Sequence, residues 1–239
     1  MGKTLVLYVF HIFNERVEYF INHCIFYDEN IDFVIISNDK NNEIKAPPFV
    51  KIIKRDNIGY DFGGWSDALL TDNLYQNYDT FLFVNSSVIG PFLPSNYQGN
   101  WINIYLNGLR DDIKLFGSTI NTCYEPFTKS HVQSYIFATD KEALEYLIRC
   151  GIFSITEYET TFIGAIQNKE IAMSTKILQN GWNIGSLLPY YKGVDFRNPQ
   201  NHNIQWQTDI MYPQYRNILW NEYELVFIKG NRIPLRPSI

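Results

Sequence analysis

The sequence predicts an α/β fold, in which one domain spanning residues 1–239 has a central, mostly parallel sheet flanked by helices. Short apolar runs rich in β-branched and aromatic residues alternate with segments of helical spacing, the pattern of consecutive βαβ units. A chain of 239 residues, 46% of them hydrophobic, is long enough to bury one substantial core. Since no repeat or Pro/Gly/Ser-rich linker divides it, we expect a single domain.

The expected elements follow in a regular order along the chain. The first half predicts strands at residues 5–10, 33–37, 50–54 and 80–84, with helices at residues 16–26 and 64–72. The second half predicts helices at residues 101–109 and 141–150, strands at 115–120 and 135–138, and an extended segment at 182–188. Ala143, Leu144 and Leu147 form one apolar face of the helix at 141–150. The polar stretch 197–207 is expected to be a mobile loop.

Charge and composition exclude several classes of protein. The net charge is −5 and no long Lys/Arg run occurs, so nucleic acid is not an expected partner. Cys24, Cys123 and Cys150 have no CxxC spacing, which indicates core packing in a reducing compartment. No stretch approaches the roughly 20 apolar residues that span a bilayer. We therefore expect a soluble, cytoplasmic protein.

Residues 55–65, RDNIGYDFGGW, form the most informative segment of the chain. They lie between an expected strand and an expected helix, and open α/β sheets bind ligands in that crevice. Glycine there permits a close backbone approach, while the charged side chains supply donors and acceptors. The ligand-binding candidates are Arg55, Asp56, Asn57, Gly59, Asp61, Gly63, Gly64 and Trp65. The alternative is a Gly-rich turn whose charges only cap the helix.

Further candidates lie at later positions. Asn85, Ser86 and Ser87 follow the strand at 80–84, where they either line a ligand or form a strand-end turn. His131 either contacts an acceptor or phosphate or has a structural role. Glu170 precedes a helical pattern, and its carboxylate either caps that helix or has a chemical role.

Several segments in one order resemble the rhamnan synthesis protein F type of glycosyltransferase and its algal and viral relatives. These segments are NIGYDFGG at 57–64, FVNSSVIGPF at 83–92, HVQS at 131–134, EIAMS at 170–174 and VFIKGNR at 226–232. The resemblance implies a GT-A-like, Rossmann-related fold that transfers a sugar from a nucleotide-diphosphate donor to a glycan acceptor. Rhamnose is the first candidate for that sugar.

The resemblance also implies roles for individual residues. Residues 55–65 and 85–87 would hold the donor, and Glu170 would be the general base of an inverting transfer, with Asp195 as the reserve candidate. GT-A enzymes usually bind Mn²⁺ or Mg²⁺ through Asp-x-Asp after the fourth strand, but residues 85–87 occupy that place and the chain contains no Asp-x-Asp. A metal cofactor is therefore doubtful. Without a metal, the diphosphate would need cations, for which the candidates are Arg55, Lys192, Arg197 and His202.

Other enzyme classes are disfavoured by missing motifs. The chain has no GxxxxGK[ST] phosphate loop, no GxGxxG fingerprint, no GxSxG elbow and no HExxH helix. The alternative to a transferase is a binding module for carbohydrate or nucleotide without catalysis, or a non-catalytic subunit of a glycan-synthesis complex. Glu170 separates these alternatives, because a binding module has no need of a carboxylate beside the reacting carbon.

Overall fold

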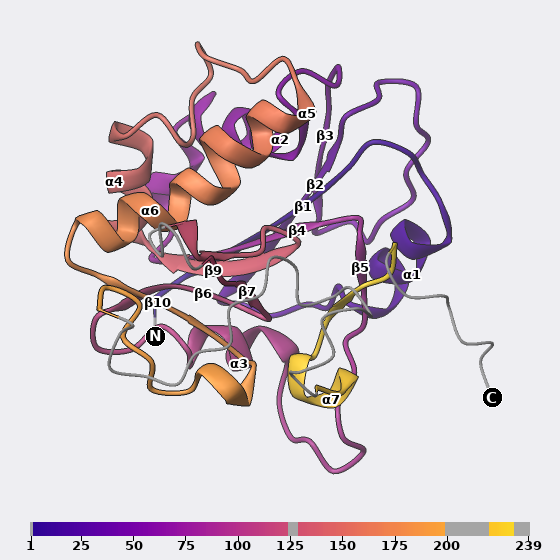
Figure 1. The fold of residues 1–239 in the computed structure, drawn as a ribbon. Coiled ribbons are helices and arrows are strands. Elements are labelled where there is room, and N and C mark those ends of the chain that lie inside the picture. Colours follow the sequence, from indigo (N-terminus) through magenta and orange to yellow (C-terminus); the bar gives the residue numbers. More distant parts are fainter. Residues whose placement is uncertain (1, 124–128, 199–219, 232–239) are drawn as a thin grey trace.

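The computed structural model describes residues 2–123, 129–198 and 220–231 (Figure 1). Its centre is a seven-stranded sheet with the strand order β10-β6-β9-β4-β1-β2-β3. The strands are β1 (Thr4–Phe10), β2 (Ile31–Ser37), β3 (Lys51–Lys54), β4 (Thr80–Asn85), β6 (Ile113–Gly117), β9 (Ile136–Asp140) and β10 (Asn183–Ser186). β9 is antiparallel to both of its neighbours, and the other adjacent strands pair in parallel. The α/β class and the mostly parallel sheet are thus confirmed.

Helices cover both faces of the sheet. They are α1 (Glu15–His23), α2 (Tyr60–Leu70), α3 (Trp101–Leu106), α4 (Lys141–Arg149), α5 (Phe162–Gly164), α6 (Ala172–Gln179) and α7 (Glu222–Leu225), with short helical turns η1 (Leu74–Asn77) and η4 (Pro189–Tyr191). A π-helical segment, η3 (Ala165–Ile171), joins α5 to α6. Two small ribbons complete the fold, one of β5 (Val88–Ile89) with β11 (Ile228–Lys229), the other of β7 (Ile120–Asn121) with β8 (His131–Val132).

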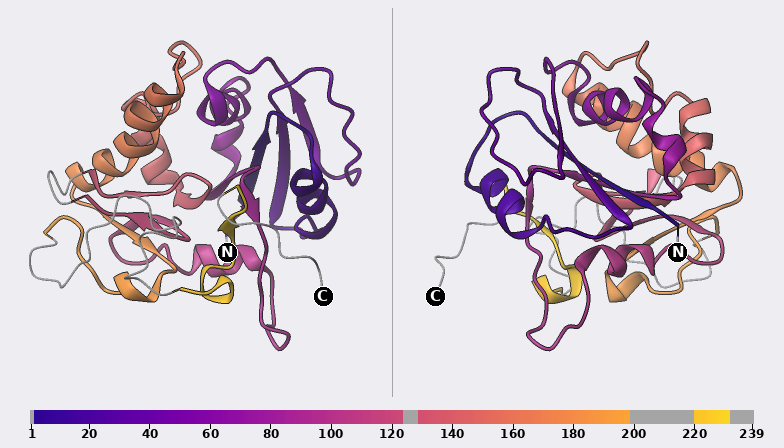
Figure 2. Two further views of the ribbon diagram at one scale, coloured as in Figure 1. Left: turned by 45° about the vertical axis from the view of Figure 1, so that its right-hand side comes forward. Right: turned by 180° about the vertical axis from the view of Figure 1, so that it is seen from behind.

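The alternation of side chains along β1 separates two apolar cores. Leu5, Leu7 and Val9 point to the core that α2, α4 and α6 cover. Val6, Tyr8 and Phe10 point to the opposite core beneath α1 and α3. The three layers are visible in the views of Figure 2. Because all seven residues of β1 are buried, this strand fixes the centre of the molecule.

Two expected helix starts were wrong. α2 begins at Tyr60 rather than near residue 64, because Gly59 at φ 75° forms its left-handed N-cap. Glu170 does not lie in a first helical turn, because the helix already begins at Phe162, where the Thr161 hydroxyl accepts a hydrogen bond from Gly164 N. The capping role that the sequence left open for Glu170 therefore falls to Thr161.

The other expected elements occur with shifted ends. The helix expected at 16–26 ends at residue 23, and the strand expected at 115–120 is divided between β6 and β7. Most of the stretch 197–207, from residue 199 onward, lies outside the described residues. Within the described ranges, no helix combines the length and the apolar content needed to cross a bilayer.

Candidate functional site

Polar side chains meet at the carboxyl ends of β1 and β4, where α2 begins. β1 and β4 are parallel neighbours, and Ser86 N donates to Val9 O over 3.0 Å. The Asn85 amide donates through Nδ2 to Asp61 Oδ2 over 3.0 Å, which ties the end of β4 to the first turn of α2. Carboxyl ends of parallel strands are the usual place for ligands in open α/β sheets. The structure thus brings Asp61 and residues 85–87 together, as the sequence predicted.

Glu170 reaches the same place from η3. Its Oε1 accepts a hydrogen bond from Ser134 N over 2.8 Å. Burial raises the pKa of Asp61 to about 6, the hydrogen bond from Asn85 opposes that rise, and the negative charge of Glu170 adds to it. Two carboxylates that influence each other at a strand edge are a common feature of sites that move protons.

Two cations, which the sequence did not single out, stand beside residues 85–87. Arg16 donates through Nε to Ser86 O over 3.0 Å, and its two terminal nitrogens have no partner among the described residues. Lys229 of β11 lies with its Nζ 5.7 Å from the Tyr135 ring centre and lowers the pKa of Asp61. No pattern marks Arg16, whereas Lys229 belongs to the resembling segment 226–232.

The turn before α2 has an unusual backbone. Gly59 and Tyr60 both have positive φ, at 75° and 55°. Tyrosine rarely adopts this conformation, which costs about 1–2 kcal/mol and is often found at functional sites. The Tyr60 ring contacts Phe162 at a centroid distance of 6.1 Å, and Phe162 is 65% exposed. An aromatic pair therefore lies beside Asp61, about two helical turns from Glu170.

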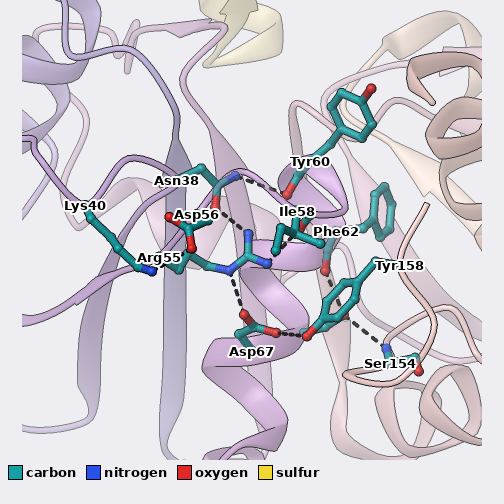
Figure 3. A network of polar contacts seen from close by, with 11 residues as sticks. Asn38, Lys40, Arg55, Asp56, Ile58, Tyr60, Phe62, Asp67, Ser154 and Tyr158 are labelled. Atoms are coloured by element: carbon teal, nitrogen blue, oxygen red, sulfur yellow. Dashed lines mark hydrogen bonds and ion pairs between the residues drawn. The ribbon is translucent and has the colours of Figure 1, made fainter. Parts of the chain in front are cut away.

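Arg55 holds this turn from below, as Figure 3 shows. Its three guanidinium nitrogens donate to Asp67 Oδ2 at 2.6 Å, Asn38 Oδ1 at 2.7 Å and Ile58 O at 2.7 Å. Asn38 in turn donates to Tyr60 O over 3.1 Å. Because each nitrogen has a partner and the residue is only 8% exposed, Arg55 is not placed to neutralise a diphosphate. It positions the turn that presents Asp61.

The neighbouring glycines and tryptophan also have packing roles. A Cβ on Gly63 would come within 2.0 Å of Ile58 O, and one on Gly64 within 2.8 Å of Val9 Cγ2. Both positions therefore let α2 approach the turn and the sheet closely. Trp65 is 0% exposed and donates through Nε1 to Leu7 O over 3.2 Å. The structure places Trp65, one of the ligand-binding candidates, inside the core that α2 covers.

The remaining candidates lie in several places. Asp56 forms an exposed ion pair with Lys40 at 2.5 Å, and Asn57 is exposed on the same turn. His131 Nδ1 contacts Lys129 O over 2.7 Å. Lys192 is exposed.

The reserve candidate Asp195 is held in an ion pair. Arg197 contacts Asp195 through Nε at 2.8 Å and Asp112 through Nη2 at 2.6 Å. The guanidinium is thereby committed to carboxylates of its own region, so Asp195 and Arg197 form a structural pair. His202 lies outside the described residues.

The end of β4 does not fit a divalent cation. Asn85 turns its Oδ1 toward Ser87, whose backbone N donates to it over 3.0 Å, and its Nδ2 toward Asp61. Hard cations require free oxygen ligands. In the part of the chain that the structure describes, no three His, Cys, Asp or Glu side chains are grouped to hold a metal. Positive charge at this edge comes instead from Arg16 and Lys229.

The fold and the candidate site define an α/β protein with charged and polar side chains grouped at one edge of its central sheet. The chain belongs to the rhamnan synthesis protein F family, whose model matches residues 33–219. This range contains Asp61, Asn85 and Glu170, whereas Arg16 and Lys229 lie outside it.

Two curated relatives match parts of the chain. Virulence protein VirA of Vibrio anguillarum (strain ATCC 68554 / 775) is 36% identical over 93 residues, covering 38% of this chain and 26% of VirA. Uncharacterized protein y4gN of Sinorhizobium fredii (strain NBRC 101917 / NGR234) is 26% identical over 193 residues, covering 75% of this chain and 46% of y4gN. Each match spans less than half the length of the relative.

Proposed function

We propose that this protein is a glycosyltransferase of GT-A-like architecture that moves a sugar from a nucleotide-diphosphate donor to a glycan acceptor. The observation that carries the proposal is the meeting of Asp61, Asn85 and Glu170 at the carboxyl edge of the sheet. Such a group of acceptors and donors suits a ligand with many hydroxyls. The rhamnan named in the family description makes a rhamnose donor the first to test.

The donor would lie across the ends of β1 and β4. Asp61 and the turn at residues 56–59, with Asp56, Asn57 and Gly59, would hold the nucleoside and its sugar through hydroxyl groups. Residues 85–87 would line the diphosphate. Residues 56–58 are exposed and would contact the base and ribose, whereas Asp61 is half-buried and would discriminate among sugars.

The transfer would be a single displacement with inversion. Glu170 accepts the proton of an acceptor hydroxyl, whose oxygen forms a bond to the anomeric carbon. The bond from that carbon to the phosphate oxygen breaks, and the nucleoside diphosphate leaves with the electron pair. The hydrogen bond from Ser134 N fixes one oxygen of Glu170, so the other is free to accept the proton.

The acceptor would approach from the side of Tyr60 and Phe162. Aromatic faces pack against the apolar face of a sugar ring, and the exposed Phe162 ring lies against Tyr60, the residue before Asp61. The His131 and Lys192 candidates would contact the acceptor or a phosphate farther from the reacting carbon.

A thermal-shift panel of UDP, GDP and dTDP sugars, each with and without Mn²⁺, tests this function. A ligand that binds only the native state raises the melting temperature with the logarithm of its concentration over Kd. A selective shift by one donor, followed by transfer to a glycan, supports the proposal. Donor binding without turnover would favour a binding module, and no shift with any donor would favour a subunit of a glycan-synthesis complex.

A further inference from the structure

We propose that Arg16 and Lys229 form a two-cation clamp that binds the diphosphate of the donor directly, without a metal ion. This inference rests on the proposed function, because it names how the same site holds the leaving group. The two residues come from opposite ends of the chain, Arg16 from the first turn of α1 and Lys229 from β11.

The arrangement around residues 85–87 brings the two cations to one place. Arg16 is anchored on Ser86 O, and Gly230 N donates to Ser87 O over 2.7 Å, which fixes the residue after Lys229 to the same turn. A Cβ on Gly230 would lie 3.1 Å from Arg16 Cδ. Arg16 and the residue after β11 therefore pack against each other, and both are hydrogen-bonded to the strand-end turn.

Arg16 is oriented for a ligand rather than for a protein partner. Its Nε bond to Ser86 O fixes the guanidinium plane, while both terminal nitrogens keep their hydrogens available within the described structure. A guanidinium fixed in this way matches two phosphate oxygens at once and loses little rotamer entropy on binding.

Lys229 supplies the second charge. It makes no hydrogen bond or ion pair within the described residues, and its ammonium group lies over the face of the Tyr135 ring. The residue after it, Gly230, donates through its backbone N to Ser87 O over 2.7 Å, which holds Lys229 next to the turn at residues 85–87. Two unpaired cations beside strand-end amide and hydroxyl groups suit an extended dianion such as a diphosphate.

The clamp would also stabilise the leaving group. Negative charge grows on the bridging phosphate oxygen as the bond to the sugar breaks. Fixed cations near that oxygen lower the free energy of the transition state and take over the task that a divalent ion has in sites with Asp-x-Asp. The poor fit of residues 85–87 to a metal agrees with this assignment.

Isothermal titration of the protein with UDP, GDP and dTDP, and with the matching nucleosides, tests the clamp in EDTA and in Mg²⁺ or Mn²⁺. We expect one nucleoside diphosphate to bind equally well in EDTA. Arg16→Gln and Lys229→Met should each weaken it by about tenfold or more, since each removes a charge-assisted contact. The weak binding of the nucleoside should not change. Arg149→Gln, an exposed charge on α4, is the matched control and should bind as the wild type does.

Three results would overturn the clamp: unchanged diphosphate affinity in both variants, binding that requires the metal, or no binding of any nucleoside diphosphate. Melting temperatures near the wild-type value show that the variants are folded. Arg16→Lys, which keeps the charge and loses the planar guanidinium, should give an intermediate affinity. If the variants bind the nucleoside diphosphate as the wild type does and still transfer sugar, the clamp is refuted and the proposed function is supported. If diphosphate binding depends on Arg16 but no sugar is transferred, the clamp is supported and the proposed function is refuted.

Discussion

The side chain of Asn85 is hydrogen-bonded to Asp61 over 3.0 Å, so the end of β4 and the start of α2 share one polar contact. Asn85 is the last residue of its strand, and Asp61 lies two residues after the left-handed Gly59. Both positions follow from the backbone, because the strand end and the turn point the two side chains at each other. The contact gives the candidate site a fixed edge against which a ligand can be oriented.

Glu170→Gln should remove turnover and spare donor binding. The amide cannot accept the proton of the acceptor hydroxyl, so kcat should fall by about 10²–10⁴-fold while the donor Kd stays within about twofold. Single-turnover assays and titration calorimetry measure the two quantities. Glu43→Gln, an exposed position in the loop before β3, is the control. Normal turnover in Glu170→Gln would refute the assignment of the base.

Asp61→Asn should change how stability depends on pH. The pKa of Asp61 rises from 3.8 to about 6 on folding, so the folded state favours the protonated acid. Asp61 therefore contributes stability below about pH 4, and this contribution is lost as the pH rises through about 6. Asparagine is always neutral, so the variant does not lose this contribution. Its free energy of unfolding should therefore rise relative to that of the wild type between these pH values, by roughly 3 kcal/mol at most.

Urea denaturation of both proteins from pH 4 to pH 8 measures this difference. Asp72→Asn, at an exposed position just after α2, controls for the loss of one negative charge. A constant difference between Asp61→Asn and wild type across the range would contradict the prediction. Loss of donor affinity in Asp61→Asn at pH 8 would add support for its role in binding.

Arg55→Lys should destabilise the fold although it keeps the charge. A lysine ammonium cannot reach Asp67, Asn38 and Ile58 O together, so buried acceptors lose their partners. We expect a loss of about 2–4 kcal/mol in the free energy of unfolding, measured by denaturant titration. Lys40→Gln removes the exposed pair with Asp56 and should cost about 1 kcal/mol or less. Equal losses in the two variants would argue against the positioning role of Arg55.

Gly63→Ala should also destabilise the protein, although alanine is the better helix former. The added Cβ would meet Ile58 O at 2.0 Å, and the turn must move to relieve this overlap. A loss of about 2 kcal/mol or more is expected by thermal denaturation. At Gly151 a Cβ meets nothing within 4 Å, so Gly151→Ala should cost only about 1 kcal/mol for its positive φ. A smaller loss at Gly63 than at Gly151 would contradict the packing argument.

Phe162→Ala should weaken binding of the acceptor and leave binding of the donor unchanged. The ring is 65% exposed and contacts Tyr60, so its removal takes away a stacking face at little cost to the core. We expect the KM for the acceptor to rise about three- to tenfold, with donor affinity unchanged. Tyr223→Ala, another exposed ring on α7, is the comparison. A change in donor affinity instead would place Phe162 on the donor side.

Much of the fold could be predicted because β-strands leave a simple pattern in the sequence. β1, β2 and β4 are continuous apolar runs, as strands buried on both faces require. The direction of β9 could not be predicted, because an apolar run has the same pattern in either orientation. The start of α2 was missed because Gly63 and Gly64 are poor helix formers, and only the close approach to Ile58 O and Val9 explains their presence.

The meeting of candidate residues was predictable only where the order of strands and helices brings them together. Asn85 ends β4 and Asp61 lies in the first turn of the helix that follows β3, so the topology brings them to one edge. Arg55 and Trp65 share the segment of Asp61, but their burial shows that they support the turn and the core. Arg16 was not predicted, because nothing near residue 16 indicates that the chain returns beside it at Gly230.

The β5–β11 ribbon places one cation of the proposed clamp late in the chain. The seven-stranded sheet is complete once residue 186 has been added, but Lys229 and the residue that fixes it to Ser87 come more than 40 residues later. During synthesis, all seven strands therefore leave the ribosome before the second cation of the proposed clamp. A product cut short between these points would contain all seven strands but lack Lys229 and four buried residues of the two cores, Leu225 to Ile228.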